Sequence, residues 1–449
     1  MIQQIEFWDR EREMKFLEER YKSGKSELVI IYGRRRIGKT KILEKFVEKF
    51  GGIYFLAAKT SIRENIQRFA KIVSIYTGKK YIESLKTLED IFTALLEVSE
   101  KDERIVVIID EFPYLVDLNP QIISELQRLW DTILIKDGRV FLILCGSSIS
   151  VMENEVLSYR SPLYGRRTGS WKVEGFSIED FIRLFQNSKP DKVIKIWSIW
   201  GNVPDYIKEY NMNRSLEWNI KNKILKKGCY LYSEPEILLR QEFREPRNLF
   251  LIMRSIAEGN HTPGKIQSAS GIDKGNISKY LNMLMRIELI AYEKLYGKKK
   301  RGLYVIKDNF FNFWFKCVYP YISELEIGNV DEVYKRIDFN RYFGYMFERF
   351  VNEIFRSKGY ITYKYLHKGE EIDIIAESKA KNELVICEVK WGTANYTDIA
   401  KLLGKIDRLS IPSNVQKKVL MVCNNYRGKE IENVNIVKLK DIFSFFHIQ

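Results

Sequence analysis

The sequence predicts an α/β protein whose 449 residues form several successive domains. Three observations lead to this prediction. Continuous β-branched runs alternate with helical patterns in the first 174 residues, which is typical of a parallel sheet covered by helices. Short helical patterns and one hairpin pattern occupy the middle of the chain. Strand patterns return in the segment 335–449, and the whole chain is too long for one hydrophobic core.

The first strand leads directly into a glycine-rich turn. Leu28–Tyr32 is apolar, 41–50 has the spacing of an amphipathic helix, and the turn reads Gly33-x-x-x-x-Gly38-Lys39-Thr40. In this context the backbone N–H groups of a turn point at phosphate oxygens, and the helix N-terminus adds positive charge. We therefore predict a P-loop, in which Lys39 reaches the β- and γ-phosphates and Thr40 binds Mg²⁺. A chance match by a basic turn is the alternative. The loop residues predicted to bind nucleotide are Gly33, Arg34, Arg35, Arg36, Ile37, Gly38, Lys39, Thr40 and Lys41.

A second buried strand pattern ends in two acids. Ile105–Ile109 is followed by Asp110 and Glu111. We expect Asp110 to hold the Mg²⁺ shell and Glu111 to polarise the attacking water. Without the upstream P-loop, an acidic turn after a core strand would be the better interpretation. A third strand pattern, "RVFLILCGSS", brings Ser147 to a position where it can sense the γ-phosphate.

Two arginines follow this third strand pattern. Arg166 and Arg167 lie in the stretch "LYGRRTG". They could supply positive charge to the phosphoryl transition state, either in the same chain or from a neighbouring subunit. A surface basic pair is an equally good interpretation.

Several of these stretches together resemble the archaeal ATPase family within the AAA+/STAND class of P-loop NTPases. They are "FWDREREMKFLEERYKSGKSELVIIYGRRRIGKT", "IIDEFPYL", "ILCGSS", "LYGRRTG" and "WGNVPDYI". The resemblance implies an ATPase that uses ATP and Mg²⁺, with a core over 1–174 and a helical lid over 175–240. It also implies that Phe7 and Arg10 lie near the adenine and that Pro204 packs near the nucleotide. The three arginines of the loop either support its electrostatics or extend to neighbouring elements or a partner subunit.

The segment 241–310 has the pattern of a winged helix-turn-helix. A short helix starts at Thr262–Pro263, a longer helix follows, and a hairpin with a basic turn ends the segment. Asn276, Ser278 and Lys279 would lie at the exposed start of the recognition helix, and Lys298–Arg301 would reach phosphate from the wing. We predict contact with DNA, and a lid or a protein-docking module is the alternative. The aromatic connector 311–334 reads as core rather than as a platform for bases.

The segment 335–449 contains a second set of chemically active residues. Glu348 lies on a helix pattern, Asp373 starts a strand, and Glu388 and Lys390 share one strand. Residues two apart on a strand face the same way, so Glu388 and Lys390 would point into one cleft. Three carboxylates can bind Mg²⁺, and the lysine can lie near the attacking water.

This pattern resembles the PD-(D/E)xK nuclease superfamily over roughly 335–449. Ile372 stands where the motif has proline. The resemblance implies metal-dependent cleavage of nucleic acid, with Glu348, Asp373, Glu388 and Lys390 as catalytic residues and the three acids as metal ligands. The alternative is a nuclease fold that is retained as an inert binding or docking module.

The composition limits the classes of molecule that the protein is expected to bind. The net charge of +15 favours an anionic partner, either nucleic acid or an acidic membrane surface, although a lysine-rich thermophile surface would look alike. Five widely spaced cysteines and three histidines predict buried thiols in a reducing cytosol and disfavour a zinc site. No apolar run approaches the roughly 20 residues of a membrane helix. We therefore expect a cytoplasmic protein that contacts no membrane.

Two functions are consistent with the sequence. The first is an ATP-driven nucleic-acid enzyme. The second is a STAND-type switch or scaffold, in which nucleotide exchange controls assembly with a protein partner or a second copy. Stimulation of ATP turnover by DNA would distinguish the two.

Overall fold

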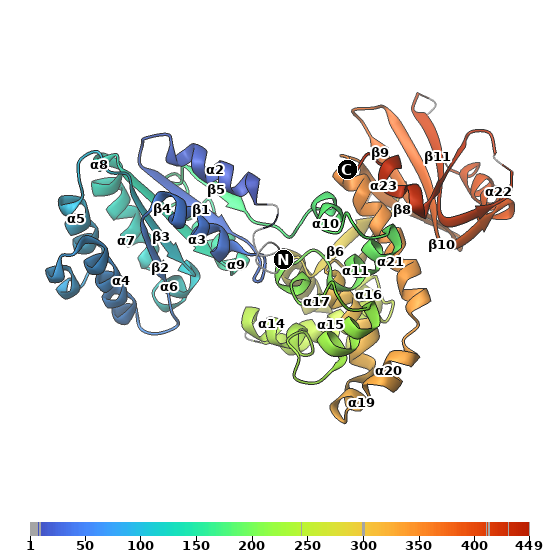
Figure 1. The fold of residues 1–449 in the computed structure, drawn as a ribbon, viewed down its shortest axis with the longest axis horizontal. Helices are drawn as coiled ribbons and strands as arrows, with labels where there is room; N and C mark the ends of the chain where they lie inside the picture. The colour runs from blue at the N-terminus through green and yellow to red at the C-terminus, as the bar shows by residue number, and fades with distance from the viewer. Residues whose placement is uncertain are drawn as a thin grey trace. The chain divides into compact units, whose positions relative to one another are not determined.

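The computed structural model describes residues 8, 10–243, 245–298, 301–409, 411, 414–429 and 431–448. The chain divides into two compact units, Met1–Gly175 and Phe176–Gln449, which are blue to teal and green to red in Figure 1. Among the described helices, none combines the length and the apolar character needed to cross a bilayer.

The first unit is built on a five-stranded parallel sheet. The strand order is β2-β3-β4-β1-β5. The predicted parallel sheet is confirmed. Its central strands are apolar on both sides, and every residue of β3 and β4 is buried, which leaves only the carboxyl ends of these strands to present polar groups. The strands are β1 (Glu27–Tyr32), β2 (Ile53–Leu56), β3 (Ile105–Asp110), β4 (Val140–Gly146) and β5 (Gly169–Lys172).

Helices cover both faces of this sheet (Figure 1). The alternation along β1 shows why: Leu28 and Ile30 join one hydrophobic core, whereas Val29 and Ile31 join the other. The helices are α2 (Glu11–Tyr21), α3 (Lys39–Phe50), α4 (Ile62–Thr77), α5 (Leu88–Val98), α6 (Phe112–Leu118), α7 (Ile122–Leu129), α8 (Ile135–Asp137) and α9 (Ile149–Val151).

The second unit begins with helices only. Several of these helices have a proline in their first turn. The backbone N–H groups of a first turn have no partner within the helix, so proline, which lacks this group, loses no hydrogen bond there. These helices are α10 (Ile178–Leu184), α11 (Pro190–Trp200), α12 (Pro204–Ile207), α13 (Leu216–Ile220) and α14 (Glu234–Glu242). They cover the segment predicted as a lid.

Three helices and an antiparallel hairpin follow, in the order expected for a winged helix. They are α15 (Pro246–Ala257), α16 (Pro263–Ser270), α17 (Lys274–Arg286), β6 (Ile290–Lys294) and β7 (Gly302–Ile306).

The aromatic connector is core. Phe310, Phe311, Phe313 and Trp314 are fully buried, and the Trp314 indole donates to the Tyr232 carbonyl at 2.7 Å. These rings therefore pack within the unit and offer no surface for bases. The connector contains α18 (Asn309–Phe313), α19 (Ile322–Glu326) and α20 (Val330–Arg336).

A mixed five-stranded sheet ends the second unit. Its order is β12-β11-β10-β9-β8, with β8, β9 and β10 antiparallel and β10, β11 and β12 parallel. The helix α22 covers one face through an apolar core, and α21 packs along β8, β9 and β10. The elements are α21 (Phe339–Ser357), β8 (Ile361–His367), β9 (Glu370–Ser378), β10 (Glu383–Asn395), α22 (Tyr396–Ile406), β11 (Gln416–Arg427), β12 (Val434–Lys438) and α23 (Ile442–Phe445).

Candidate functional site

The predicted P-loop connects β1 to α3. A side chain at Gly33 would place its Cβ 2.3 Å from the Val173 carbonyl oxygen, so this position accepts only glycine. Gly38 has a φ of 87° and caps α3 in the left-handed region. The Lys39 side chain is nearly buried, and its Nζ donates to the Arg34 carbonyl at 2.9 Å. Burial lowers the pKa of Lys39. The loop thus has the shape and the charge of a phosphate cradle.

Thr40 faces the end of β3. Its hydroxyl donates to Asp110 Oδ2 at 2.9 Å, and the Tyr54 hydroxyl donates to the same oxygen at 2.5 Å. Asp110 is 1 % exposed. A hydroxyl and a carboxylate next to a phosphate cradle form an oxygen donor set that suits Mg²⁺. Tyr54 is a residue that the sequence analysis missed, because β2 reaches Asp110 only through strand pairing.

Glu111 lies between the loop and the end of β4. Its Oε2 accepts from the Ser147 hydroxyl at 2.7 Å, and its Oε1 lies 3.7 Å from Arg35 Nη1. The residue precedes α6 and has a φ of 52°, an unusual value for a residue other than glycine. Arg35 also donates to the Tyr114 hydroxyl at 3.3 Å, so this arginine reaches a neighbouring element.

Arg10 holds the P-loop in place through hydrogen bonds to backbone carbonyl oxygens. Its guanidinium donates to the carbonyl oxygens of Ile37 at 2.7 Å and Glu174 at 3.1 Å, and it pairs with Glu13 at 3.0 Å. Arg10 is buried, and its donors contact the protein's own backbone. Phe7, which was expected beside it, lies outside the described residues.

The remaining predicted loop residues have varied settings. Ile37 is part of the core, Arg34 is buried, and Arg36 has a φ of 73°. Lys41 pairs with Glu44 at 3.2 Å on the surface of α3. Pro204 starts α12 in the second unit and is buried there.

Arg166 and Arg167 lie at the other end of the sheet. Arg166 grips Asp131 with Nε at 3.2 Å and Nη2 at 3.0 Å, and Arg167 covers the Tyr164 ring at 4.9 Å. The next residue, Thr168, bonds Leu28 at the amino end of β1, whereas the P-loop follows the carboxyl end. The pair thus lies away from the P-loop of its own chain, and its role at the phosphates, in the same chain or from a neighbouring subunit, stays a prediction.

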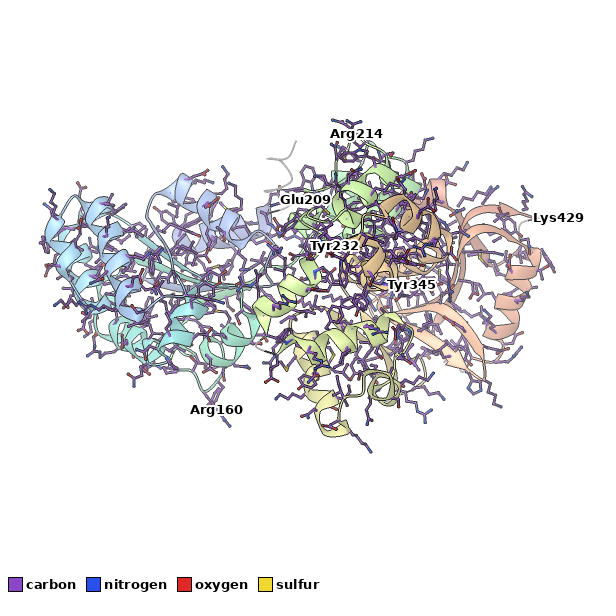
Figure 2. All side chains as sticks on the ribbon, turned by 90° about the horizontal axis from the view of Figure 1, so that it is seen from below. Arg160, Glu209, Arg214, Tyr232, Tyr345 and Lys429 are labelled. Atoms are coloured by element: carbon purple, nitrogen blue, oxygen red, sulfur yellow. The ribbon has the colours of Figure 1, made fainter. Side chains whose placement is uncertain are left out.

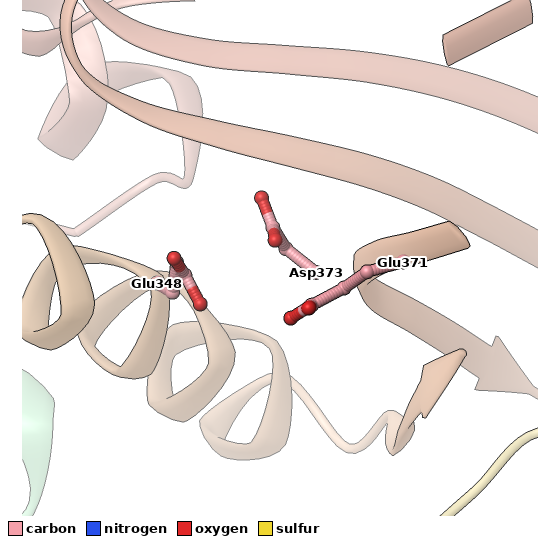
Figure 3. Close-up of side chains that lie close together, drawn as sticks. All are labelled: Glu348, Glu371 and Asp373. Atoms are coloured by element: carbon pink, nitrogen blue, oxygen red, sulfur yellow. The ribbon is translucent and has the colours of Figure 1, made fainter. Parts of the chain in front are cut away.

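The second unit contains an acidic site. Carboxylate oxygens of Glu348, Glu371 and Asp373 all lie within 4.8 Å of one another (Figure 3). Glu348 comes from α21 and the other two from β9. Asp373 Oδ2 also accepts from the Val389 N–H at 2.8 Å, which holds it at the junction of β9 and β10. This oxygen donor set fits a divalent cation. Glu371 was missed, although its spacing of two from Asp373 places both on one face.

Glu388 and Lys390 face α22. Glu388 Oε1 pairs with Lys405 at 2.8 Å, and Lys390 Nζ pairs with Asp398 at 2.7 Å. Both thus share one side, as their spacing predicts. However, Lys390 is engaged by Asp398, and among the described residues the acidic group that fits a cation does not include Glu388. Glu388 lies close enough to affect the charge state of Glu348 and Asp373.

Another lysine enters the acidic site. Lys364 of β8 pairs with Glu371, and its Nζ lies 3.8 Å from Glu348 Oε2. Burial alone would lower the pKa of Lys364, but Glu348 and Glu371 raise it above its ordinary value. Burial, together with Glu371 and Glu388, raises the pKa of Glu348 to about 7. Burial, Glu348 and Glu388 raise the pKa of Asp373.

Comparison with known proteins identifies the family. A protein of Methanocaldococcus jannaschii is 34% identical over 417 residues, which are 90% of this chain and 92% of that one. A family model described as an ATPase domain predominantly from Archaea matches residues 7–210. The chain belongs to this archaeal ATPase family. An uncharacterised ATP-binding protein of the same organism is 46% identical over 44 residues, which are 10% of this chain and 75% of that protein.

Two further likenesses concern the fold and the C-terminal half. The solved structure of a Walker-type ATPase of Pyrococcus abyssi has a TM-score of 0.53 at 21% identity. The match covers 69% of this chain and 96% of that chain. A second family model, described as archaeal and bacterial proteins of unknown function, matches 314–402 and so spans the acidic site. The chain is thus a P-loop protein with an AAA+-like sheet and a distinct C-terminal region.

The residues predicted to read DNA are exposed. Asn276, Ser278 and Lys279 project from the first turns of α17, while Ile277 and Leu281 face the core. Lys298 and Arg301 are exposed at the hairpin, and residues 299–300 lie outside the described residues. Other basic side chains, such as Arg160, Arg214 and Lys429, project from the surface in Figure 2.

Proposed function

We propose that this protein hydrolyses ATP to ADP and phosphate, binds DNA through its winged helix, and carries a metal-dependent nuclease site in its second unit. One observation carries the ATPase proposal. The P-loop brings Lys39 and Thr40 to the end of β3, where Thr40 contacts Asp110 and Ser147 contacts Glu111. Cradle, metal-binding oxygens and a water-orienting acid are then within one site.

Each residue of this site has a chemical role in the proposal. Lys39 would leave the Arg34 carbonyl and bind the β- and γ-phosphates, together with the N–H groups of the loop. Thr40 and Asp110 would hold Mg²⁺, which supplies charge neutralisation to the phosphates. Glu111 would orient the water that attacks the γ-phosphorus, and the bond from that phosphorus to the bridging oxygen breaks. The Ser147 hydroxyl fixes the Glu111 carboxylate.

The DNA-binding part rests on exposure and charge. The first turns of α17 carry polar side chains in the position from which a recognition helix reads base edges. The net charge of +15 favours a polyanion. The nuclease part rests on the acidic site: Glu348, Glu371 and Asp373 would hold a divalent cation, with Glu388 beside them, and the cation would stabilise the oxyanion of phosphodiester cleavage.

One observation favours a second function, a nucleotide-dependent switch with an inert C-terminal module. The cavity beside the acidic site has a volume of only about 90 Å³. It is walled by Glu293, Leu303 and Val305 of the hairpin as well as by Glu348 and Asp373. A cavity of this size can hold an ion or a small group but not a duplex, which favours a module that does not cut nucleic acid.

Phosphate release with and without DNA tests the proposal. We expect Mg²⁺-dependent turnover that DNA stimulates, loss of turnover in Lys39→Ala, and loss of stimulation alone in Lys279→Glu. Supercoiled, linear, single-stranded and branched DNA would be incubated in parallel with Mg²⁺ or Mn²⁺, with Asp373→Asn as the control for cleavage. Turnover that no form of DNA stimulates, together with uncut DNA, would favour the switch.

A further inference from the structure

The acidic site contains its own cation. Lys364 lies where the register of β8 and β9 shifts between Tyr363 and Tyr365. At this irregularity the Lys364 ammonium pairs with Glu371, and Glu348 Oε2 lies 3.8 Å away. The Lys364 side chain is only 22 % exposed. The Lys364 ammonium is thus close to two of the three clustered carboxylates, in the position to which these carboxylates would attract a bound cation.

The lysine expected from the sequence does not take this place. Lys390 is held by Asp398 at 2.7 Å, and Asp398 also accepts from the Asn395 N–H at 2.9 Å at the start of α22. Moving Lys390 toward Glu348 would break its ion pair with Asp398. Lys364 needs no such rearrangement.

The hairpin of the winged helix anchors Lys364. Leu295, directly after β6, forms a parallel bridge with Lys364, and the Tyr296 N–H donates to the Lys364 carbonyl at 2.9 Å. The rings of Tyr296 and Tyr363 meet edge to face with centroids 5.8 Å apart. Arg356 of α21 adds an ion pair with Glu293 of β6 at 3.8 Å. The backbone that presents the ammonium is thus fixed from the hairpin side.

We propose that Lys364, rather than Lys390, is the lysine that acts in the acidic site. It is a positioning residue, and its ammonium occupies the cation position until a divalent metal displaces it. This inference rests on the proposed metal-dependent site. Three carboxylates within 4.8 Å repel one another unless a cation lies among them. In the metal-free protein Lys364 supplies that charge, so a metal must compete with it. After displacement the ammonium stays beside the site, where it can face a phosphodiester oxyanion.

Mn²⁺ binding tests this inference without relying on activity. Full-length protein without nucleotide is titrated with Mn²⁺, and free Mn²⁺ is counted by electron paramagnetic resonance. Binding that is lost in Asp373→Asn defines the acidic site. We expect Lys364→Met to bind Mn²⁺ about tenfold more tightly than wild type, because the competing charge is gone. Lys364→Arg should restore the wild-type affinity to within about threefold.

Two variants test whether removing any other lysine of this region changes Mn²⁺ affinity as much as removing Lys364. Lys381→Met removes an exposed lysine in the turn between β9 and β10, and we expect its Mn²⁺ affinity to stay within about twofold of wild type. Lys390→Met tests the rival lysine and should behave like Lys381→Met. If Lys364→Met fails to fold by circular dichroism, Lys364→Gln replaces it.

The outcomes separate this inference from the proposal beneath it. Equal or weaker Mn²⁺ binding by Lys364→Met, with binding still lost in Asp373→Asn, overturns the role of Lys364 and leaves the metal site. A gain in Lys390→Met that Lys364→Met does not show assigns the role to Lys390. Mn²⁺ binding that Asp373→Asn leaves unchanged, or none in any variant, overturns the metal site itself.

Discussion

Lys39 is a buried ammonium whose present partner is a backbone carbonyl of its own loop. ATP would replace that carbonyl with charged phosphate oxygens. We predict that Lys39→Ala weakens ATP binding by about 100-fold, since a hydrogen bond between charged groups contributes up to about 3 kcal/mol. Calorimetric titration with ATP and Mg²⁺ measures this. Unchanged affinity would show that the loop binds no phosphate.

Glu111 can be tested apart from binding. Glutamine keeps an oxygen for the Ser147 hydroxyl but loses the charge that orients water. We predict that Glu111→Gln binds ATP within about threefold of wild type and turns it over about 100-fold more slowly. Single-turnover phosphate release gives the rate. Normal turnover would assign the water-orienting role to another residue.

At the scale of single elements, Arg10 links α2 to the P-loop through the Ile37 carbonyl. We predict that Arg10→Ala lowers the free energy of unfolding of the first unit by about 2 kcal/mol, because buried carbonyl oxygens lose a charged donor. Thermal melts with and without ATP measure the loss. As a matched control, Lys45→Ala removes an exposed partner of Glu48 and should change stability by less than about 0.5 kcal/mol. Equal effects would mean that Arg10 braces nothing.

Elements that are local in the sequence were predictable, whereas contacts between elements were not. The P-loop and the acids at Asp110 and Glu111 follow from strand and helix patterns that need no partner. Tyr54 reaches Asp110 only because β2 pairs with β3. Lys364 reaches Glu371 through the pairing of β8 with β9, whose register shifts at that point. Arg166 lies at the opposite end of the sheet from the P-loop, because the chain crosses back to that end before β5 begins. The residues around Arg166 do not reveal this course of the chain.

At the scale of the whole molecule, pH should act through the acidic site. The pKa of Glu348 is raised to about 7, against an ordinary value of 4.5, because the group is buried. Between these values the folded chain binds more protons than the unfolded chain, so its free energy of unfolding falls as pH rises and levels off above about 7. Asp373 and Glu388, whose pKa values are also raised, act in the same direction.

Urea melts in EDTA at pH 5, 6, 7 and 8 measure this dependence. The quantity to compare is the stability of wild type minus that of Glu348→Gln, which removes the titration of this one group. We expect the difference to fall with rising pH. A constant difference would mean that Glu348 titrates as an ordinary exposed acid, and a difference that rises would mean that folding lowers its pKa.

The net charge of the protein leads to a second prediction for the whole molecule. If the basic surface binds DNA phosphates, affinity should fall steeply with salt, by about tenfold or more between 50 and 200 mM KCl. Fluorescence anisotropy with a labelled duplex measures the slope. Lys279→Glu should weaken binding and flatten that slope, whereas affinity that salt does not change would exclude phosphate contacts as its source.

The hydrogen bond from Tyr296 to the Lys364 carbonyl joins the hairpin to the edge of the C-terminal sheet. Deuterium from solvent can replace the Tyr296 amide proton only when the hairpin and β8 separate. The exchange rate of this amide therefore reports how often the segment that carries Lys364 loses its anchor. Slow exchange in the free protein and faster exchange with bound DNA would reveal a mechanical link between the surface that meets the polyanion and the carboxylates behind it.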